Sequence, residues 1–168
     1  MATEKDIQNH IFQKLYDRKK DGQNMFFDIT SNIKFFDWES DLLFKNQQGS
    51  IYEIEIKTSL SDYLKDFENK KKKHKELSKT RQNVPAYFYF LVPADIADNI
   101  EVPEYCGLYK YTEYQCRERG LVIDTYIVKE APKLTNITAS YTDTIKMLRS
   151  TAFKYWRART GHITKIRK

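Results

Sequence analysis

The stretch Glu53–Lys57 (Glu-Ile-Glu-Ile-Lys) alternates charged and apolar residues one by one. A period of two is typical of a β-strand whose two faces meet different surroundings. The run 37–44 upstream also reads as an extended segment, and a short polar connection containing a glycine separates the two. A hairpin closed by this connection would place Asp41 beside Glu55 and Lys57 on one face of a sheet. The pattern therefore predicts a fold in which two carboxyl groups and one ammonium group gather on a strand pair.

Two carboxylates and a lysine are the groups that metal-assisted cleavage of a phosphodiester requires. Carboxylate oxygens bind a hard cation such as Mg²⁺, for which Mn²⁺ can substitute, and the cation polarises a phosphate and acidifies a water. The lysine neutralises charge as the oxygen attacks. The alternative is that Asp41, Glu55 and Lys57 form the solvated charged face of an ordinary hairpin. The helices and the buried strand expected around them argue for a shared pocket instead, because they would cover both sheet faces.

Three further acids are candidates for the same site. Glu39 and Glu53 lie two residues before Asp41 and Glu55, on the same predicted faces, and can serve as additional ligands or lie on a solvent-exposed rim. Glu4 lies near the start of the first predicted helix. It can add a carboxylate to the site, or only favour the helix start through the helix dipole.

The net charge of +6 favours an anionic partner, and the positive charge is concentrated in two segments. Segment 70–81 has seven basic residues and one acid, and segment 146–168 has eight basic residues and no acid. We expect the nucleic-acid contacts to come from Lys70, Lys71, Lys72, Lys73, His74, Arg149, Arg157 and Arg159. The alternatives are solvated helix faces for both segments and a general-base role for His74. Tyr155 and Trp156 can stack on bases, or Tyr155 can pack inward with the arginines outward.

The sequence shows no feature of a secreted or membrane protein. Its two cysteines fit neither a disulfide framework nor a metal-binding pair, and its start is charged and lacks an apolar core. No apolar run approaches the length needed to cross a bilayer. We therefore expect a soluble cytoplasmic protein with no membrane partner.

Periodicity predicts one α/β domain spanning residues 1–168, with a mixed sheet flanked by helices and a basic helix and tail from about 141 to 168. A Thr3–Asp6 capping pair opens the first helix, and Asp21-Gly22 stops it. Ser31-Asn32 is a candidate turn between the first two strands. Ile145, Leu148, Ala152 and Tyr155 share one face of the last helix. The expected helices are 3–20, 61–79 (capped by Ser59 or Ser61) and 141–159, and the expected strands are 26–33, 34–44, 50–57, 86–92, 108–114 and 121–128.

These residues resemble the PD-(D/E)xK nuclease superfamily, whose restriction-endonuclease-like fold has an αβββαβ core. Asp41 matches the superfamily's first acid, and Glu55-Ile56-Lys57 matches its D/E-x-K triplet. A longer pattern resembles MmcB-like DNA-repair proteins and related phage-encoded proteins; it comprises residues 55–59, 61–67, 72–74, 87–93 and 102–108. The resemblance implies Asp41, Glu55 and the Ile56 carbonyl as Mg²⁺ ligands. It implies Lys57 as the group that orients or deprotonates the attacking water.

We therefore expect a metal-dependent deoxyribonuclease that hydrolyses DNA phosphodiester bonds in repair, recombination or phage DNA processing. Its substrate would be duplex, single-stranded or branched DNA, and its location the cytoplasm of a bacterial or phage-infected cell. A homodimer would suit the cutting of branched junctions. A non-catalytic nucleic-acid-binding module on the same scaffold is the main alternative. A phage accessory protein that binds a host protein through its aromatic surface is a third.

Overall fold

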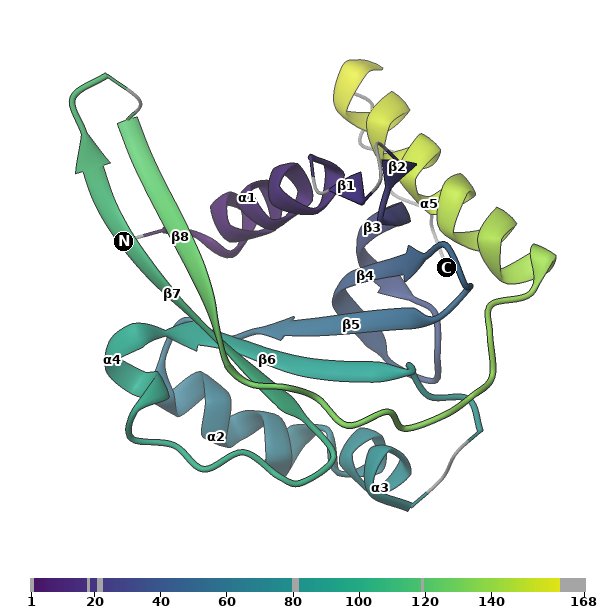
Figure 1. Ribbon diagram of the computed structural model, residues 1–168, viewed down its shortest axis with the longest axis horizontal. Coiled ribbons are helices and arrows are strands. Elements are labelled where there is room, and N and C mark those ends of the chain that lie inside the picture. Colours follow the sequence, from purple (N-terminus) through teal and green to yellow (C-terminus); the bar gives the residue numbers. More distant parts are fainter. Residues whose placement is uncertain (1, 18, 21–22, 80–81, 119, 161–168) are drawn as a thin grey trace.

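The described residues form one six-stranded sheet with helices on both of its faces (Figure 1). The computed structural model describes residues 2–17, 19–20, 23–79, 82–118 and 120–160. In chain order the elements are α1 (Glu4–Tyr16), β1 (Lys19–Lys20), β2 (Gln23–Asn24), β3 (Phe26–Lys34), β4 (Glu39–Asn46), β5 (Ile51–Ile56), α2 (Leu60–Asn69), α3 (Lys71–Lys79), β6 (Tyr87–Pro93), α4 (Ala94–Ala97), β7 (Gly107–Cys116), β8 (Gly120–Lys129) and α5 (Tyr141–Thr160). Strands β3 to β8 lie in sequence order, with β5–β6 and β6–β7 parallel and the other neighbours antiparallel. The α/β class and the mixed sheet are confirmed.

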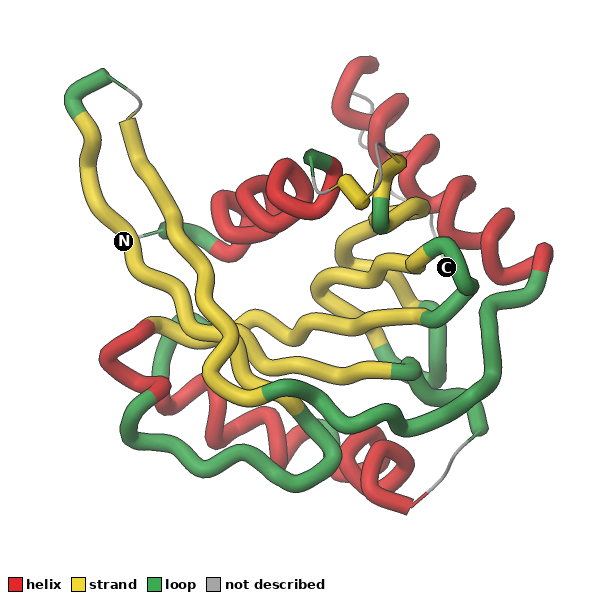
Figure 2. The backbone as a smooth tube through the Cα atoms, viewed as in Figure 1, coloured by secondary structure: helices red, strands yellow, loops and turns green. Residues whose placement is uncertain are grey.

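Each face of the sheet has its own hydrophobic cluster. Helices α2, α3 and α4 lie below the sheet and α1 above it in the view of Figure 2. The lower cluster includes Leu43, Tyr63, Leu77, Phe88 and Phe90, and the upper one includes Ile7, Ile11, Ile54, Ile56 and Leu91. Strand β6 contributes alternate residues to both clusters. The strand predicted at 86–92 is therefore buried on both faces, as its continuous apolar run indicates.

The helix-start signals in the sequence are confirmed. Thr3 and Asp6 form a capping box at α1, and Ser59 Oγ accepts a 3.1 Å hydrogen bond from the Asp62 amide at the start of α2. Helix α1 ends at Tyr16, earlier than predicted, and the expected stop at Asp21-Gly22 lies outside the described residues.

Two further predicted boundaries are wrong. The turn predicted at Ser31-Asn32 is absent, and strand β3 continues through these residues to Lys34. Asn32 has a φ of 44° there, but the strand does not end. The helix predicted over 61–79 is two helices, broken at Lys70. No glycine or proline marks that break. Lys70 instead leaves helical geometry where its ammonium group contacts the sheet, so tertiary contacts override local propensity.

Helix α5 covers the outer edge of the sheet. Thr151 Oγ1 donates to the Ile29 carbonyl at 3.3 Å, and Lys154 Nζ donates to the carbonyls of Ser31 and Asn32. These donors satisfy carbonyls of the edge strand β3 that have no strand partner on that side. Met147 is the buried side chain of this helix. The predicted inward face of Ile145, Leu148, Ala152 and Tyr155 is therefore wrong: the last three are exposed, because the helix turns polar donors toward β3.

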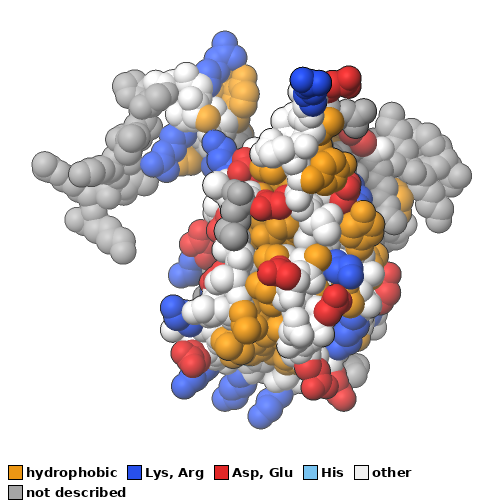
Figure 3. All heavy atoms as spheres, turned by 90° about the vertical axis from the view of Figure 1, so that its left-hand side faces the viewer, with side chains coloured by type: hydrophobic (Ala, Val, Ile, Leu, Met, Phe, Trp, Pro, Cys, Tyr) orange, Lys and Arg blue, Asp and Glu red, His pale blue; other side chains and the backbone are white. Residues whose placement is uncertain are grey.

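The β7–β8 hairpin projects beyond the body of the sheet (Figure 1). Figure 3 shows the side of the molecule that carries this hairpin, and there hydrophobic, acidic and basic side chains are interspersed. This face therefore lacks the uniform positive charge expected of a surface that grips DNA. None of the described helices is both long and apolar enough to cross a membrane.

Candidate active site

Asp41 and Glu55 face each other where the pairing of β4 with β5 ends. The last pair in register is Leu42 with Ile54, so the next residues along, Asp41 and Glu55, project together from the opposite face. Asp41 Oδ2 accepts a 2.8 Å hydrogen bond from the Ile56 amide. The carboxylate thus takes the place of the next strand carbonyl and holds the two strands together beyond the ladder. The expected hairpin is confirmed, and it brings Asp41 beside Glu55.

Glu55 is fully buried and is surrounded by three lysines. Its Oε1 accepts from Lys57 Nζ at 2.9 Å and also contacts Lys70 Nζ, while its Oε2 accepts from Lys73 Nζ at 2.5 Å. Burial alone would raise the pKa of this carboxyl group, but the nearby lysine ammonium groups, Lys73 foremost, hold the pKa below its usual value. These ammonium groups therefore favour the ionised form of Glu55.

Glu53 shares Lys73 with Glu55. Glu53 is 0% exposed, and its Oε1 accepts from Lys73 Nζ at 2.7 Å and from Trp38 Nε1 at 3.0 Å. The solvent-exposed rim considered for Glu53 is therefore wrong. Both carboxylate oxygens of Glu53 accept from Trp38 Nε1, so the side chain points into the core and stabilises the packing there.

Asp66 on α2 completes the group. Its Oδ1 accepts from Lys57 Nζ at 2.6 Å, and its Oδ2 lies 2.8 Å from His74 Nε2. The other ring nitrogen of His74 lies 2.9 Å from the Tyr105 hydroxyl. Burial would raise the pKa of Asp66, but hydrogen bonds from His74 and Lys57 lower it. We call the whole set the acid–lysine cluster; it consists of Asp41, Glu53, Glu55, Lys57, Asp66, Lys70, Lys73 and His74.

Asp41 is the carboxyl group of this cluster that makes no ion pair with a described residue. Burial, and then the charge of Glu55, raise its pKa to about 7, and the more distant Glu4 acts in the same direction. The lysines and the imidazole lie against Glu53, Glu55 and Asp66 instead. A further positive charge beside Asp41 would therefore be electrostatically favourable.

The donors around Asp41 suit a small divalent cation. The Ile56 N–H points to Asp41, and since N–H and C=O of one strand residue point the same way, the Ile56 carbonyl also faces β4. Asp41, Glu55 and this carbonyl then supply oxygen donors only, which is the chemistry that Mg²⁺ prefers. Within the described ranges, no three His, Cys, Asp or Glu side chains are grouped so that they could hold a metal. Mg²⁺ sites commonly use one or two carboxylates, with water and substrate phosphates completing the shell.

The raised pKa of Asp41 leads to a prediction for the folded protein. Mg²⁺ should raise the unfolding temperature more at pH 8 than at pH 6, because at the lower pH the cation must first displace the Asp41 proton. Thermal unfolding at several Mg²⁺ concentrations measures this directly. Asp41→Asn should abolish the Mg²⁺-dependent shift. An equal shift at both pH values, or an unchanged shift in the variant, would place the cation elsewhere.

The other two candidate acids lie apart from Glu55. Glu4 accepts a 2.8 Å hydrogen bond from Gln8 Nε2, which also donates to the Asp41 carbonyl at 3.0 Å. The first helix thus approaches the candidate site through Gln8. Glu39 is exposed and acts electrostatically on Lys154 of α5. Among the described contacts, nothing joins Glu39 to the acid–lysine cluster.

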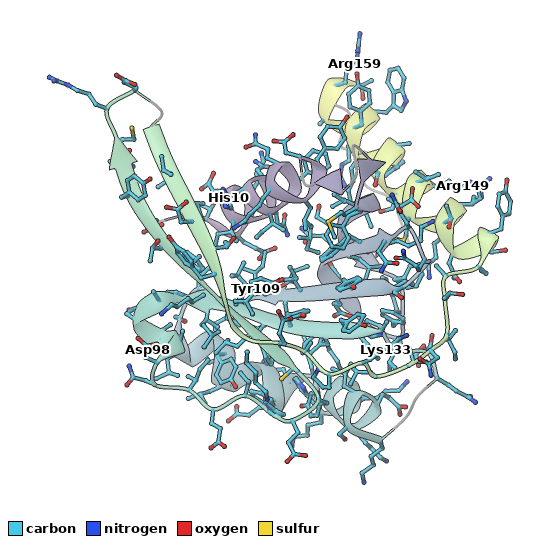
Figure 4. All side chains as sticks on the ribbon, in the orientation of Figure 1. His10, Asp98, Tyr109, Lys133, Arg149 and Arg159 are labelled. Atoms are coloured by element: carbon cyan, nitrogen blue, oxygen red, sulfur yellow. The ribbon has the colours of Figure 1, made fainter. Side chains whose placement is uncertain are left out.

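The lysine-rich segment is only partly a surface. Lys73 is 2% exposed and His74 is 8% exposed, so the nucleic-acid contacts predicted for these two are wrong in this arrangement. Their charges and hydrogen bonds are used by buried carboxylates. Lys70 is about one-third exposed and also contacts Glu55, which leaves Lys71 and Lys72 as the exposed lysines of the predicted set. Arg149, Arg157 and Arg159 are exposed on α5, where Figure 4 labels the first and last of them.

Asp66 is a member of the acid–lysine cluster that the sequence analysis did not predict. A signal was present, because Tyr63, Asp66, Lys70, Lys73 and Leu77 follow the spacing of one helix face. Charged residues on the same stripe as buried apolar ones indicate an internal ion-pair network. The prediction that Lys70–His74 contact DNA phosphates placed this run on the surface and overlooked that pattern.

Comparison with known proteins shows the fold alone. No protein-family model matches the chain, and no curated protein matches it. Among solved structures, the chain is similar to the SPO1766 protein of unknown function from Silicibacter pomeroyi, with a TM-score of 0.58 and 15% sequence identity. The match covers 96% of this chain and 92% of that one. The two proteins thus share their architecture over nearly the whole length. The sequence identity is too low to indicate a shared function.

Proposed function

We propose that this chain is a Mg²⁺-dependent nuclease of the PD-(D/E)xK kind that hydrolyses phosphodiester bonds in DNA. The observation that carries the proposal is the opposed pair Asp41 and Glu55, with Lys57 Nζ 2.9 Å from Glu55. Burial, and then the charge of Glu55, raise the pKa of Asp41 to about 7, and no described cation forms an ion pair with it. Asp41, Glu55 and the Ile56 carbonyl would hold the metal, which would polarise the phosphate and lower the pKa of a bound water.

Lys57 would act as a fixed positive charge in this scheme. Burial lowers the pKa of its ammonium group, but Glu55 and Asp66 outweigh that effect and raise it. A lysine whose pKa is raised stays protonated at neutral pH. Lys57 would therefore orient the attacking water and stabilise charge on the phosphate, and would not serve as the base.

One observation favours a second function, a nucleic-acid-binding module without catalysis. Glu55 already has three lysine partners, and Lys70 contacts it from the more exposed side of the cluster. If Lys70 stays there, its ammonium group occupies the position in which a cation would bind Glu55. Catalysis therefore requires Lys70 to move away from Glu55 when the metal binds.

A cleavage panel separates the two functions. Supercoiled, linear duplex, single-stranded and branched DNA are incubated with the protein in Mg²⁺, in Mn²⁺ and in chelator. The nuclease predicts metal-dependent cutting that is lost in Lys57→Met and kept in Lys71→Met, a matched change of an exposed lysine. If the protein binds DNA in chelator but cuts it in neither metal, the result contradicts the nuclease and supports the binding module.

A further inference from the structure

The outer face of α5 combines exposed aromatic rings with positive charge. The helix carries five basic residues and one acid, Asp143. Lys146 and Lys154 donate to backbone carbonyls of β3 and its turn, and the exposed positive charge comes from the three arginines together with Lys146. Four aromatic side chains of the helix are more than half exposed: Tyr141 (81%), Phe153 (57%), Tyr155 (54%) and Trp156 (57%).

The rings near the end of α5 are arranged with an arginine among them. Arg159 lies over the Trp156 ring at 5.7 Å from its centre and donates a 2.9 Å hydrogen bond to the Tyr155 hydroxyl. The Tyr155 and Trp156 rings contact each other edge to face at 5.5 Å. Flat exposed rings beside a guanidinium group are suited to stacking on nucleobases with a phosphate nearby.

A cavity lies beside one of these rings. It has a volume of about 310 Å³ and lies between α1, α5 and the sheet, with Phe12 and Tyr155 among its walls. Gln8 also lines this cavity, and its amide donates to the Asp41 carbonyl at 3.0 Å. The cavity thus offers space beside Tyr155 for a group of a strand that lies on α5.

We propose that α5 binds the unpaired bases of single-stranded DNA. The inference rests on the proposed nuclease function and specifies its substrate class. Bases in a duplex are stacked on each other and offer no free face to Tyr155 or Trp156, whereas an unpaired strand offers one at each nucleotide. The excess of arginine on this helix complements the phosphates of that strand.

Binding without cleavage tests the substrate class. Fluorescence anisotropy in chelator compares a deoxythymidine oligonucleotide, an abasic oligonucleotide of equal length and a duplex. Loss of one stacked base weakens binding about 5- to 150-fold, the factor equal to ~1–3 kcal/mol. We expect the wild type to prefer the oligonucleotide with bases by at least the lower factor. The double variant Tyr155→Ala/Trp156→Ala should lose that preference and keep its duplex affinity.

Tyr114→Ala is the matched control, since Tyr114 on the β7–β8 hairpin is 51% exposed and lies away from α5. It should leave all three affinities unchanged. Equal binding of the oligonucleotides with and without bases would overturn the proposal, and so would equal losses on single strand and duplex. A sedimentation experiment in which the double variant turns a dimer into a monomer would assign the face to a second copy instead. Cutting in Mg²⁺ is scored separately, so failure of the nuclease function is distinguishable from failure of this inference.

Discussion

Asp41→Asn should abolish DNA cleavage and stabilise the fold at the same time. The amide keeps an oxygen that can accept from the Ile56 N–H but removes the charge that would hold the metal. We expect cleavage in Mg²⁺ to fall by roughly 10²–10³-fold or more, the scale seen when one electrostatic contribution to a transition state is removed. Asp37→Asn, a change of an exposed carboxyl group, should leave cleavage intact.

The stabilisation of Asp41→Asn should depend on pH in a defined direction. The folded pKa of Asp41 is about 7 and its ordinary value is 3.8, so the folded wild type retains a proton that the unfolded chain has lost between about pH 4 and 7. The wild type therefore loses stability from this group as the pH rises through that window, and the variant does not. At pH 8 the variant should be more stable by about 2–4 kcal/mol. Denaturant unfolding at pH 5 and pH 8 measures the difference, and a variant that is less stable at pH 8 would contradict it.

Lys73→Met should have the opposite effect on stability. It leaves Glu53 and Glu55 buried without the cation that they share, while the methionine still fits against the Phe88 ring, which lies 4.6 Å from Lys73 Nζ. Removing one partner of a buried ion pair lowers the free energy of unfolding by about 3–5 kcal/mol. We therefore expect the unfolding temperature to fall by about 6–20 °C. Calorimetry or circular dichroism at neutral pH measures it.

Lys72→Met is the control for that variant. Lys72 pairs with Asp37, and both side chains are more than half exposed, so its loss should change stability by no more than about 0.5 kcal/mol. Adding Glu53→Gln to Lys73→Met should restore part of the lost stability, because it removes the buried carboxylate that loses its lysine partner, whereas Glu55 keeps Lys57 and Lys70. If Lys72→Met and Lys73→Met have the same small effect, the buried charge network is not as described.

The sequence predicts the part of the site that depends on one strand and its hairpin. Alternation in 53–57 predicts that Glu53 and Glu55 share a face, and the structure confirms it. The polar connection before β5 predicts the hairpin that sets Asp41 opposite Glu55. Local period and turn chemistry suffice here, because the residues concerned lie within about 15 positions of one another.

The remainder depends on how helices sit on the sheet, which local patterns do not encode. Lys73 and His74 lie in a run whose composition favours exposure, yet they face carboxylates of β5 and α2. The register of α3 over β5 decides that pairing. Helix α5 shows the same limit, since Thr151 and Lys154 donate to edge-strand carbonyls that no apolar side chain could satisfy.

The position of a bound metal tests the central claim most directly. Crystals grown with Mn²⁺ at pH 8 should show an anomalous peak between the side chains of Asp41 and Glu55. Oxygen ligands should lie within about 2.0–2.3 Å, including the Ile56 carbonyl, and Lys70 should be withdrawn from Glu55. A structure at saturating Mn²⁺ with no peak there, and with Lys70 still against Glu55, would contradict the account.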